Sequence, residues 1–226
     1  MENIILNTKS ALIANNMNAY AVEAKEEAME LLKNLLKEQS TVAVGGSVTL
    51  DQLGVISLLR NGNYNFIDRY EKDISREEVE KRFRLGLLSD YFIMSSNAIT
   101  EDGCLYNVDG NGNRVAALCY GPENVIVIAG KNKIVKDIKE AQTRVKTIAT
   151  PKNCQRLGIN SYCSNTGKCM SLTSDNPELC DGCHADSRIC CTYVISAMQR
   201  KKGRITVILI NEELGYWFCN TNLTDF

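Results

Sequence analysis

The densest group of reactive side chains in the sequence is a set of cysteines between positions 163 and 190. Two of them form a Cys180-Asp181-Gly182-Cys183 motif, a spacing that lets two thiolates bind one metal ion. The segment has few apolar residues, so metal binding would supply the folding energy that a core supplies elsewhere. Zinc and iron–sulfur clusters both use four cysteines, and these spacings do not separate them. We expect a metal site here; reduced loop thiols and a redox-active pair are the alternatives.

A second candidate site lies in the glycine-punctuated stretch from Asn97 to Arg114. A carboxylate in a partly closed cleft can act as a general acid or base, and we assign this role to Asp109 and Glu101. Arg114 could hold a substrate carboxylate in a bidentate fork, with Asn113 beside it. The alternative is a series of plain turns, because Glu-Asp-Gly, Asp-Gly and Asn-Gly are turn sequences. The turn interpretation carries most weight for Glu101, and the functional one for Asp109, Asn113 and Arg114.

A third candidate is Gly45-Gly46-Ser47, which lies between a predicted strand and a predicted helix. Backbone N–H groups at such a junction favour an anion, and Ser47 or Thr49 can add a hydroxyl. The alternative is an ordinary strand-to-helix turn in which Thr49 only caps the helix. Lys131 follows another predicted strand, at the end of the sheet where α/β proteins bind ligands, and is a further candidate.

The elements that must position these residues alternate between strands and helices. Apolar residues at helical spacing predict one long helix over residues 10–39, and residues 134–148 are also helical by period. Capping patterns at Thr49 and Ser75 predict two further helices. Short apolar or β-branched runs predict strands; they cover residues 41–44, 64–67, 91–95, 125–129, 191–197 and 204–210.

The predicted class is therefore α/β, with a mostly parallel sheet and helices on both faces. The composition shifts after Pro151, where Ser, Asn, Asp and cysteine dominate. We expect one domain over residues 1–226, with a cysteine-rich insertion at 151–190.

Composition excludes some functions. The formal net charge is −1, and nucleic-acid binding needs a basic excess. No apolar run approaches the roughly 20 residues that cross a bilayer, and the first residues carry no secretory pattern. We therefore expect a cytoplasmic protein without nucleic-acid or membrane partners. Ten cysteines in a reducing compartment favour metal ligation or buried thiols over disulfides. Buried small side chains are expected at Cys104, Cys119, Cys154, Cys191 and Cys219.

Several blocks of the sequence resemble the stand-alone LUD-domain (lactate-utilisation, DUF162) family. The resemblance runs in order from about residue 10 to residue 215. The blocks are VAVGGSVTL (42–50), SNAITEDG (96–103), NVDGNGNRVA (107–116), GP (121–122), GKNKIV (130–135) and TGKC (166–169). The resemblance implies a fold similar to those of ribose-5-phosphate isomerases, coenzyme A transferases and 5-formyltetrahydrofolate cyclo-ligase.

The resemblance also selects a shared set of metal ligands, Cys163, Cys169, Cys183 and Cys190. The chain departs from the family pattern here: thirteen residues separate Cys169 from Cys183, where stand-alone members usually have two. Cys180, which the extra residues bring in, is then a substitute or a spectator, and the adjacent His184 could replace one sulfur.

The leading hypothesis is a protein of organic-acid metabolism that binds a small anionic metabolite. The family connection is to oxidation of lactate, together with oxidoreductase partner subunits, and a homo-oligomer is possible. We expect no NAD, because Gly45-Gly46-Ser47 is not a G-x-G-x-x-G fingerprint. The expected cleft combines residues 45–49, 97–102 and 109–114, and its proposed substrate contacts are Gly45, Gly46, Ser47, Thr49, Asn97, Thr100, Asn113, Arg114 and Lys131.

Two other classes remain open. One is a sugar-phosphate isomerase or acyl-transfer enzyme that uses Asp109 or Glu101 as its base. The other is a non-catalytic iron–sulfur scaffold or electron-transfer subunit. Cys104 follows the Glu-Asp-Gly turn directly and is a candidate nucleophile, although His184 is the only histidine that could serve it as a base.

Overall fold

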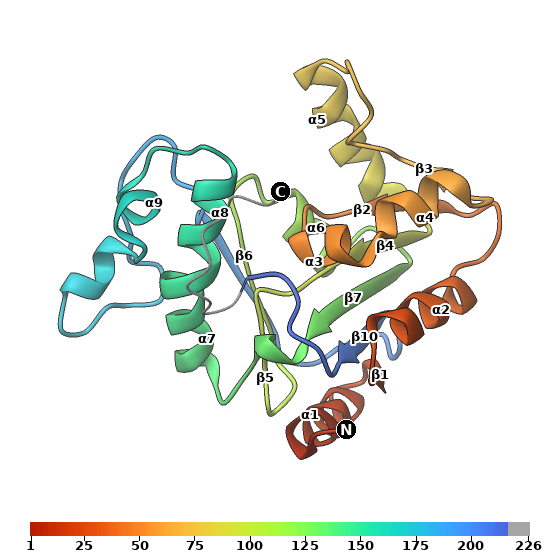
Figure 1. Ribbon diagram of the computed structural model, residues 1–226, viewed down its shortest axis with the longest axis horizontal. Helices are drawn as coiled ribbons and strands as arrows, with labels where there is room; N and C mark the ends of the chain where they lie inside the picture. The colour runs from red at the N-terminus through yellow and green to blue at the C-terminus, as the bar shows by residue number, and fades with distance from the viewer. Residues whose placement is uncertain (217–226) are drawn as a thin grey trace.

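A computed structural model describes residues 1–216 and shows a six-stranded, entirely parallel central sheet (Figure 1). The four inner strands are mostly apolar and buried, as expected for a parallel sheet that is covered on both faces, whereas the two edge strands are partly exposed. The expected α/β class with a mostly parallel sheet is therefore confirmed. In spatial order the strands are β1 (Asn18–Val22), β10 (Ile205–Ile210), β7 (Asn124–Gly130), β4 (Tyr91–Met94), β2 (Thr41–Val44) and β3 (Asn65–Phe66).

Successive residues of each strand enter opposite cores, because side chains alternate across a strand. In β7, Ile126 and Ile128 pack with helices α2 (Lys25–Leu35), α3 (Val48–Leu53) and α4 (Val55–Asn61). Val125 and Val127 pack on the opposite side with α1 (Asn3–Ala14), α6 (Asn113–Cys119) and part of a second sheet. Helices therefore contribute to both faces, as the sequence predicts.

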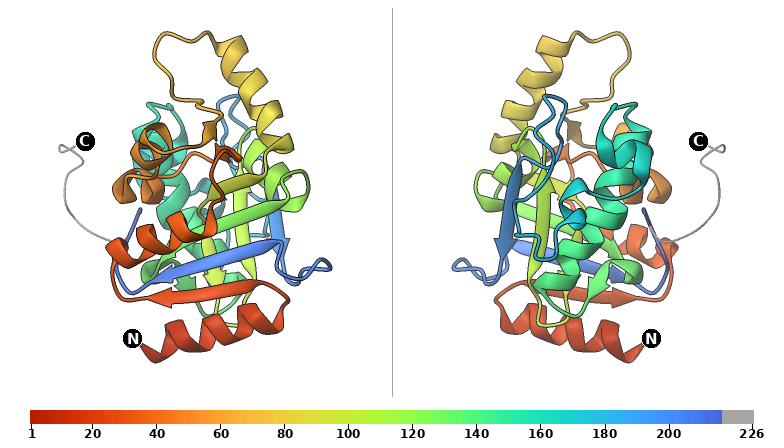
Figure 2. Two further views of the ribbon diagram at one scale, coloured as in Figure 1. Left: turned by 90° about the vertical axis from the view of Figure 1, so that its right-hand side faces the viewer. Right: turned by 90° about the vertical axis from the view of Figure 1, so that its left-hand side faces the viewer.

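The second sheet has four strands in the order β8 (Ile134–Val135), β5 (Ala98–Thr100), β6 (Leu105–Asp109) and β9 (Thr192–Ser196). β5 and β6 form an antiparallel hairpin, and β9 pairs antiparallel with β6. Figure 2 shows these strands running crosswise to those of the central sheet. The strands predicted near residues 191–197 and 204–210 thus belong to different sheets.

A long helical segment covers the outer face of the second sheet. It comprises α7 (Ile138–Arg144), a π-helical stretch η3 (Val145–Ala149) and α8 (Thr150–Arg156). π-Helical stretches inside helices are rare and occur often at functional sites. The helix predicted from residue 134 begins only at Ile138, because Ile134 and Val135 form β8 beside β5. After α8 come only α9 (Tyr162–Thr166) and η4 (Met170–Thr173) before β9.

The single helix predicted over residues 10–39 is wrong. The chain leaves α1 at Asn15, turns through Asn16 at φ +62°, forms β1, and then enters α2. Asparagine tolerates this left-handed conformation better than most residues. β1 pairs with β10 over its full length, so tertiary pairing overrides the local helical period.

The two predicted helix caps differ in outcome. Ser75 caps α5 (Arg76–Leu85), because its hydroxyl accepts a hydrogen bond from the backbone of Glu78; η1 (Gly86–Leu88) follows. Thr49 caps nothing, because α3 already begins at Val48 and Ser47 occupies the N-cap position. No helix within residues 1–216 is long and apolar enough to span a membrane.

Candidate functional site: a cation-lined cavity

A cavity of about 380 Å³ lies beyond the carboxyl ends of the central strands. Its walls come from the loop after β2, the loop after β4, the end of β6 with the start of α6, and the helical segment α7–η3–α8. Loops that leave the same edge of a parallel sheet converge, and α/β proteins bind their ligands there. Ser47, Asn97 and Arg114 therefore share one cavity, although they are far apart in the sequence.

Positive charge dominates the lining. Among the described residues, one carboxylate lines the cavity, that of Asp109. A concave site lined mainly by one sign of charge attracts ligands of the opposite sign. We call it the cation-lined cavity, after its five basic side chains: Arg69, Arg114, Lys133, Arg144 and Arg156.

Arg114, at the start of α6, is a structural cation and not a free fork. Its Nη1 donates to the Ser95 carbonyl at 3.0 Å and to Asn107 Oδ1 at 2.5 Å. Its Nη2 donates to Asn97 Oδ1 and to the Val108 carbonyl, both at 2.8 Å, and its Nε lies 3.4 Å from a carboxylate oxygen of Asp109.

A guanidinium has five N–H donors, and these contacts occupy all five. The predicted bidentate grip of Arg114 on a substrate therefore has no donors to make it. The side chain instead joins the loop after β4 to strand β6. Burial lowers the pKa of Arg114, while the neighbouring Asp109 opposes the shift.

Asp109 ends β6 and lines the cavity with a carboxylate that is already engaged. One oxygen accepts a hydrogen bond from the backbone N–H of Gly112 at 3.0 Å, and the other faces Arg114. The first contact shapes the turn into α6. Asp109 as a general base stays a prediction, and a substrate proton would have to compete with these two partners.

Lys133 follows the same strand as Lys131, but of the two lysines the sequence analysis selected only Lys131. Lys133 ends η2 (Lys131–Lys133), directly before β8, and its side chain is buried. Nζ donates to Thr49 Oγ1 at 2.6 Å and to Ser95 Oγ at 2.7 Å. Burial, and then the charges of Arg144 and Arg114, hold the pKa of this amine well below its usual range. The clue in the sequence is a lysine directly before the apolar pair Ile134-Val135.

Two further cations, Arg144 and Arg69, reach the cavity from outside the predicted motifs. Arg144 donates to three backbone carbonyls at 2.6–3.1 Å, including that of Asn97, and burial lowers its pKa to about 10. The guanidinium carbon of Arg69 lies 5.0 Å from the ring centroid of Tyr70 and 4.4 Å from that of Phe83. Its Nε is buried and has no acceptor within residues 1–216. An unsatisfied buried donor beside a cavity is a position for a ligand oxygen.

The structure brings together some of the predicted substrate contacts and not others. Gly45 lies beneath Arg114, but Lys131 turns away and pairs with Glu2 at 2.6 Å. Glu101 is exposed in the β5–β6 turn, where the Thr100 hydroxyl accepts a hydrogen bond from the Cys104 backbone. The residues that do line the cavity are Gly46, Ser47, Thr49, Asn97, Asp109, Asn113 and Arg114.

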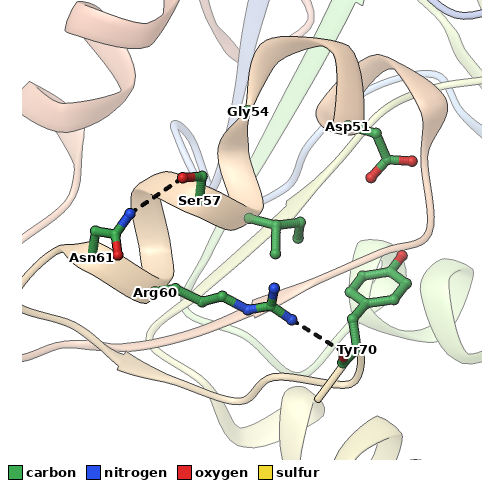
Figure 3. A pocket seen from close by; sticks show the side chains of 7 residues that line it. Asp51, Gly54, Ser57, Arg60, Asn61 and Tyr70 are labelled. Atoms are coloured by element: carbon green, nitrogen blue, oxygen red, sulfur yellow. Dashed lines mark hydrogen bonds between the residues drawn. The ribbon is translucent and has the colours of Figure 1, made fainter. Parts of the chain in front are cut away.

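A neighbouring hollow of about 490 Å³ beside α3 and α4 has a different character (Figure 3). Its cation, Arg60, pairs with Asp68 at 2.7 Å and donates to the backbone carbonyl of Tyr70 at 3.1 Å. Asp51 also lines it, and burial raises the pKa of that carboxyl, with Arg156 and then Arg69 opposing. A hollow whose one guanidinium already has a carboxylate partner offers an anion little.

The four cysteines that the family resemblance selects surround one small hollow of about 10 Å³, which we call the cysteine hollow. Arg188 donates to the Cys190 sulfur at 3.3 Å and to the carbonyls of Cys180 and Cys183. The hollow is lined by Cys163, Cys169, Cys183 and Cys190, together with Val145, Lys146, Thr150, Tyr162, Met170 and Tyr193.

No group of three or more potential ligands within residues 1–216 is arranged to hold a metal ion. The expected metal centre is therefore not shown. The sulfurs of Cys163 and Cys154 lie 3.8 Å apart. Cys180 and His184 do not line the cysteine hollow.

The remaining cysteines follow the expectation of burial only in part. Cys154 is buried and Cys104 partly so, but Cys119 and Cys191 are exposed. Burial raises the pKa of the Cys104 thiol, and a reactive nucleophile needs the opposite shift. Cys104 also does not line the cation-lined cavity. Cys219 lies outside the described residues.

One helical segment separates the cation-lined cavity from the cysteine hollow. Arg144, Asn153 and Arg156 line the cavity, whereas Lys146 lines the hollow. Thr150, the first residue of α8, borders both.

The model of the LUD domain matches residues 5–210 of the chain. No curated protein matches the sequence. Among solved structures, a DUF162-family protein from Deinococcus radiodurans is similar, with a TM-score of 0.47 and 13% identity over 92% of this chain and 95% of that one. The eIF2B beta subunit from Chaetomium thermophilum matches with a TM-score of 0.35 and 14% identity, over 52% of this chain and 44% of that one.

Proposed function

The chain belongs to the LUD-domain family, and on that premise we propose that it binds a small organic anion in the cation-lined cavity. The proposed ligand class is the 2-hydroxy and 2-oxo acids of lactate-type metabolism. The observation that carries the proposal is the imbalance of charge, with five basic side chains against one carboxylate among the described lining residues. The carboxylate of such an acid would supply the missing counter-charge.

The size of the cavity suits this class. A volume of about 380 Å³ lies at the lower end of the range for ligand pockets, which suits a small metabolite better than a dinucleotide. The roles divide between positioning and contact. Arg114 is a positioning residue whose donors hold the walls, whereas Arg69 and Lys133 line the cavity and would contact the ligand.

The test is calorimetric titration of the full chain with L-lactate, D-lactate and pyruvate, with lactamide as the uncharged counterpart of lactate. We expect saturable binding of at least one acid, weakened by added salt, and none of lactamide. If none of the three acids binds, or if lactamide binds equally well, the cavity is not a carboxylate site.

A second function, which the grouping of four thiols favours, concerns the cysteine hollow. Thiolates are ligands for zinc and for iron–sulfur clusters, so the donor chemistry fits either. The positions do not yet form a site, because no three ligands converge within residues 1–216. We propose that metal loading draws Cys163, Cys169, Cys183 and Cys190 together, with an oxidoreductase partner in the iron–sulfur case.

Anaerobic purification followed by metal analysis and a visible spectrum distinguishes these possibilities. Iron with sulfide absorption supports the electron-transfer subunit, and one equivalent of zinc supports a structural clasp. The matched variants are Cys169→Ser, which should lose the metal, and Cys191→Ser, an exposed neighbour that should keep it. Protein without metal overturns both forms of this proposal and leaves the anion site untouched.

A further inference from the structure

We infer that Lys133 is a nucleophilic amine that condenses with the carbonyl group of a 2-oxo acid held in the cation-lined cavity. The inference rests on the proposed function, because the cavity must first bind such an acid. It adds a covalent step that the binding proposal does not contain. The residues that carry it are Lys133, its two hydroxyl partners and two neighbouring arginines.

The position of the amine is the first argument. Lys133 follows the central strand β7 and reaches the cavity from the buried side, where its Nζ is held by Thr49 Oγ1 and Ser95 Oγ. A lysine tethered at two points is fixed in place, as a reacting group needs to be. Two hydroxyl acceptors leave one of the three donor directions of an ammonium, or the lone pair of a neutral amine, for a ligand.

The absence of a counter-charge is the second argument. Within residues 1–216 no carboxylate pairs with Lys133, whereas Lys131, two residues earlier, has Glu2 at 2.6 Å. A buried lysine held only by neutral hydroxyls gains little from being charged. The charges of Arg144 and Arg114 act in the same direction as burial and lower the pKa of Lys133. A lysine made neutral in this way is the form that attacks carbonyl carbons.

The same surroundings suit the other end of the substrate. The carboxylate of a 2-oxo acid is bonded directly to its carbonyl carbon, so an anion held by the nearby cations brings that carbon to the amine. Arg144 spends its hydrogen bonds on neutral carbonyls and has no carboxylate partner within the described chain, so its charge remains available to an anion. Positive charge around the site thus performs two tasks: it binds the acid and keeps the amine neutral.

The chemical step balances without an oxidant or reductant. The lone pair of Nζ forms a bond to the carbonyl carbon, and the carbon–oxygen π electrons move to oxygen, which takes up a proton. Nitrogen loses a proton to give a neutral carbinolamine. Loss of the hydroxyl group with one proton, as water, then gives the imine. The products are one carbon–nitrogen double bond and one water molecule.

Reductive trapping tests this directly on the full chain. The protein is incubated with pyruvate and sodium cyanoborohydride, digested, and each lysine is scored by peptide mass spectrometry. We expect a reduced adduct at Lys133 with an occupancy on the order of tenfold above that of any other lysine, since each unit of pKa lowering multiplies the neutral amine about tenfold. L-lactate, which has the charge of pyruvate without its ketone, should suppress the adduct by competition.

Three variants complete the design. Lys133→Met and Lys133→Arg should abolish the adduct, and Lys133→Arg keeps a charge at this position. Lys136→Met is the matched control, because Lys136 is exposed three residues later and should leave trapping unchanged. Circular dichroism checks that each variant is folded, and trapping on the unaltered protein needs no variant at all.

The outcomes separate the two proposals. Saturable pyruvate binding without an adduct at Lys133 overturns the nucleophile and leaves the anion site standing. Adducts spread evenly over many lysines overturn it as well. Absence of both binding and adduct overturns the nucleophile together with the proposed function.

Discussion

The backbone of Gly45 lies directly against the aliphatic stem of Arg114. A β-carbon added to Gly45 would lie 2.9 Å from Cδ and 3.0 Å from Cγ of that arginine, closer than such atoms approach. The stem cannot move aside easily, because its guanidinium is held at both ends by hydrogen bonds. The glycine after β2 and the arginine that opens α6 therefore fix each other's position.

Gly45→Ala should lower the free energy of unfolding by about 2 kcal/mol, because it overpacks a site that cannot yield. Gly46→Ala is the matched control. Its added β-carbon would meet nothing closer than 3.5 Å, so it should cost little. Urea denaturation of the two variants makes the comparison, and equal stabilities would show that the Arg114 stem moves freely.

Arg114→Gln should destabilise the fold by about 3 kcal/mol, since it leaves several buried acceptors without their donor. Arg84→Gln, at a side chain that is 75% exposed, should change stability by no more than about 0.5 kcal/mol. Thermal and chemical unfolding measure both. If Arg114→Gln is as stable as the unaltered protein but does not bind anions, Arg114 is a substrate ligand and not a positioning residue.

Arg69→Gln should weaken binding of a 2-hydroxy or 2-oxo acid by about tenfold to a hundredfold, the cost of one charge-assisted hydrogen bond. The reason is its buried Nε, which has no acceptor among the described residues. Arg60→Gln serves as control, because Arg60 is already paired with Asp68 in the neighbouring hollow and should leave affinity unchanged. Titration calorimetry of both variants decides, and equal losses would point to a general charge effect.

Lys133 should make stability depend on pH in a defined direction. Its folded pKa is lowered, so between that value and about 10.5 the unfolded chain carries a proton that the folded chain does not. Stability relative to Lys133→Met should therefore rise with pH through this window and level off at both ends. Denaturation at a series of pH values measures the difference. For the exposed control Lys136→Met, the curve of unfolding free energy against pH should run parallel to that of the unaltered protein. If the Lys133→Met curve also runs parallel to that of the unaltered protein, the pKa of Lys133 is not lowered by folding.

The central sheet was predictable because its strands are read locally. Val125–Ala129 and Thr41–Val44 are short apolar runs that only a doubly covered sheet buries. The stretch from residue 10 to 39 was not, because the spacing of its leucines fits a helix and nothing local marks β1, which exists through its pairing with β10. The second sheet escaped notice for a similar reason. Its strands are short, and β9 pairs with a strand more than eighty residues earlier.

The location of the candidate site was predictable from the sequence, but the roles of its individual residues were less so. Residues 46–49, 95–97 and 108–114 follow strands or end them, so their convergence follows from the parallel sheet. Arg114 has the right position, but the sequence cannot show that Ser95, Asn97 and Asn107 supply acceptors around it. Arg144 gave no signal of its own, because a charged residue in a helical period is usually solvated.

Thr150 lies between the two hollows described above. It belongs to the helical segment α7–η3–α8 and lines both the cation-lined cavity and the cysteine hollow. A substitution of Thr150 alters the lining of both at once, so a loss of activity in such a variant cannot be assigned to the cavity or to the hollow alone. If binding of an anion in the cavity changes the affinity of the cysteine hollow for a metal, then metal binding must change the affinity of the cavity for the anion by the same factor.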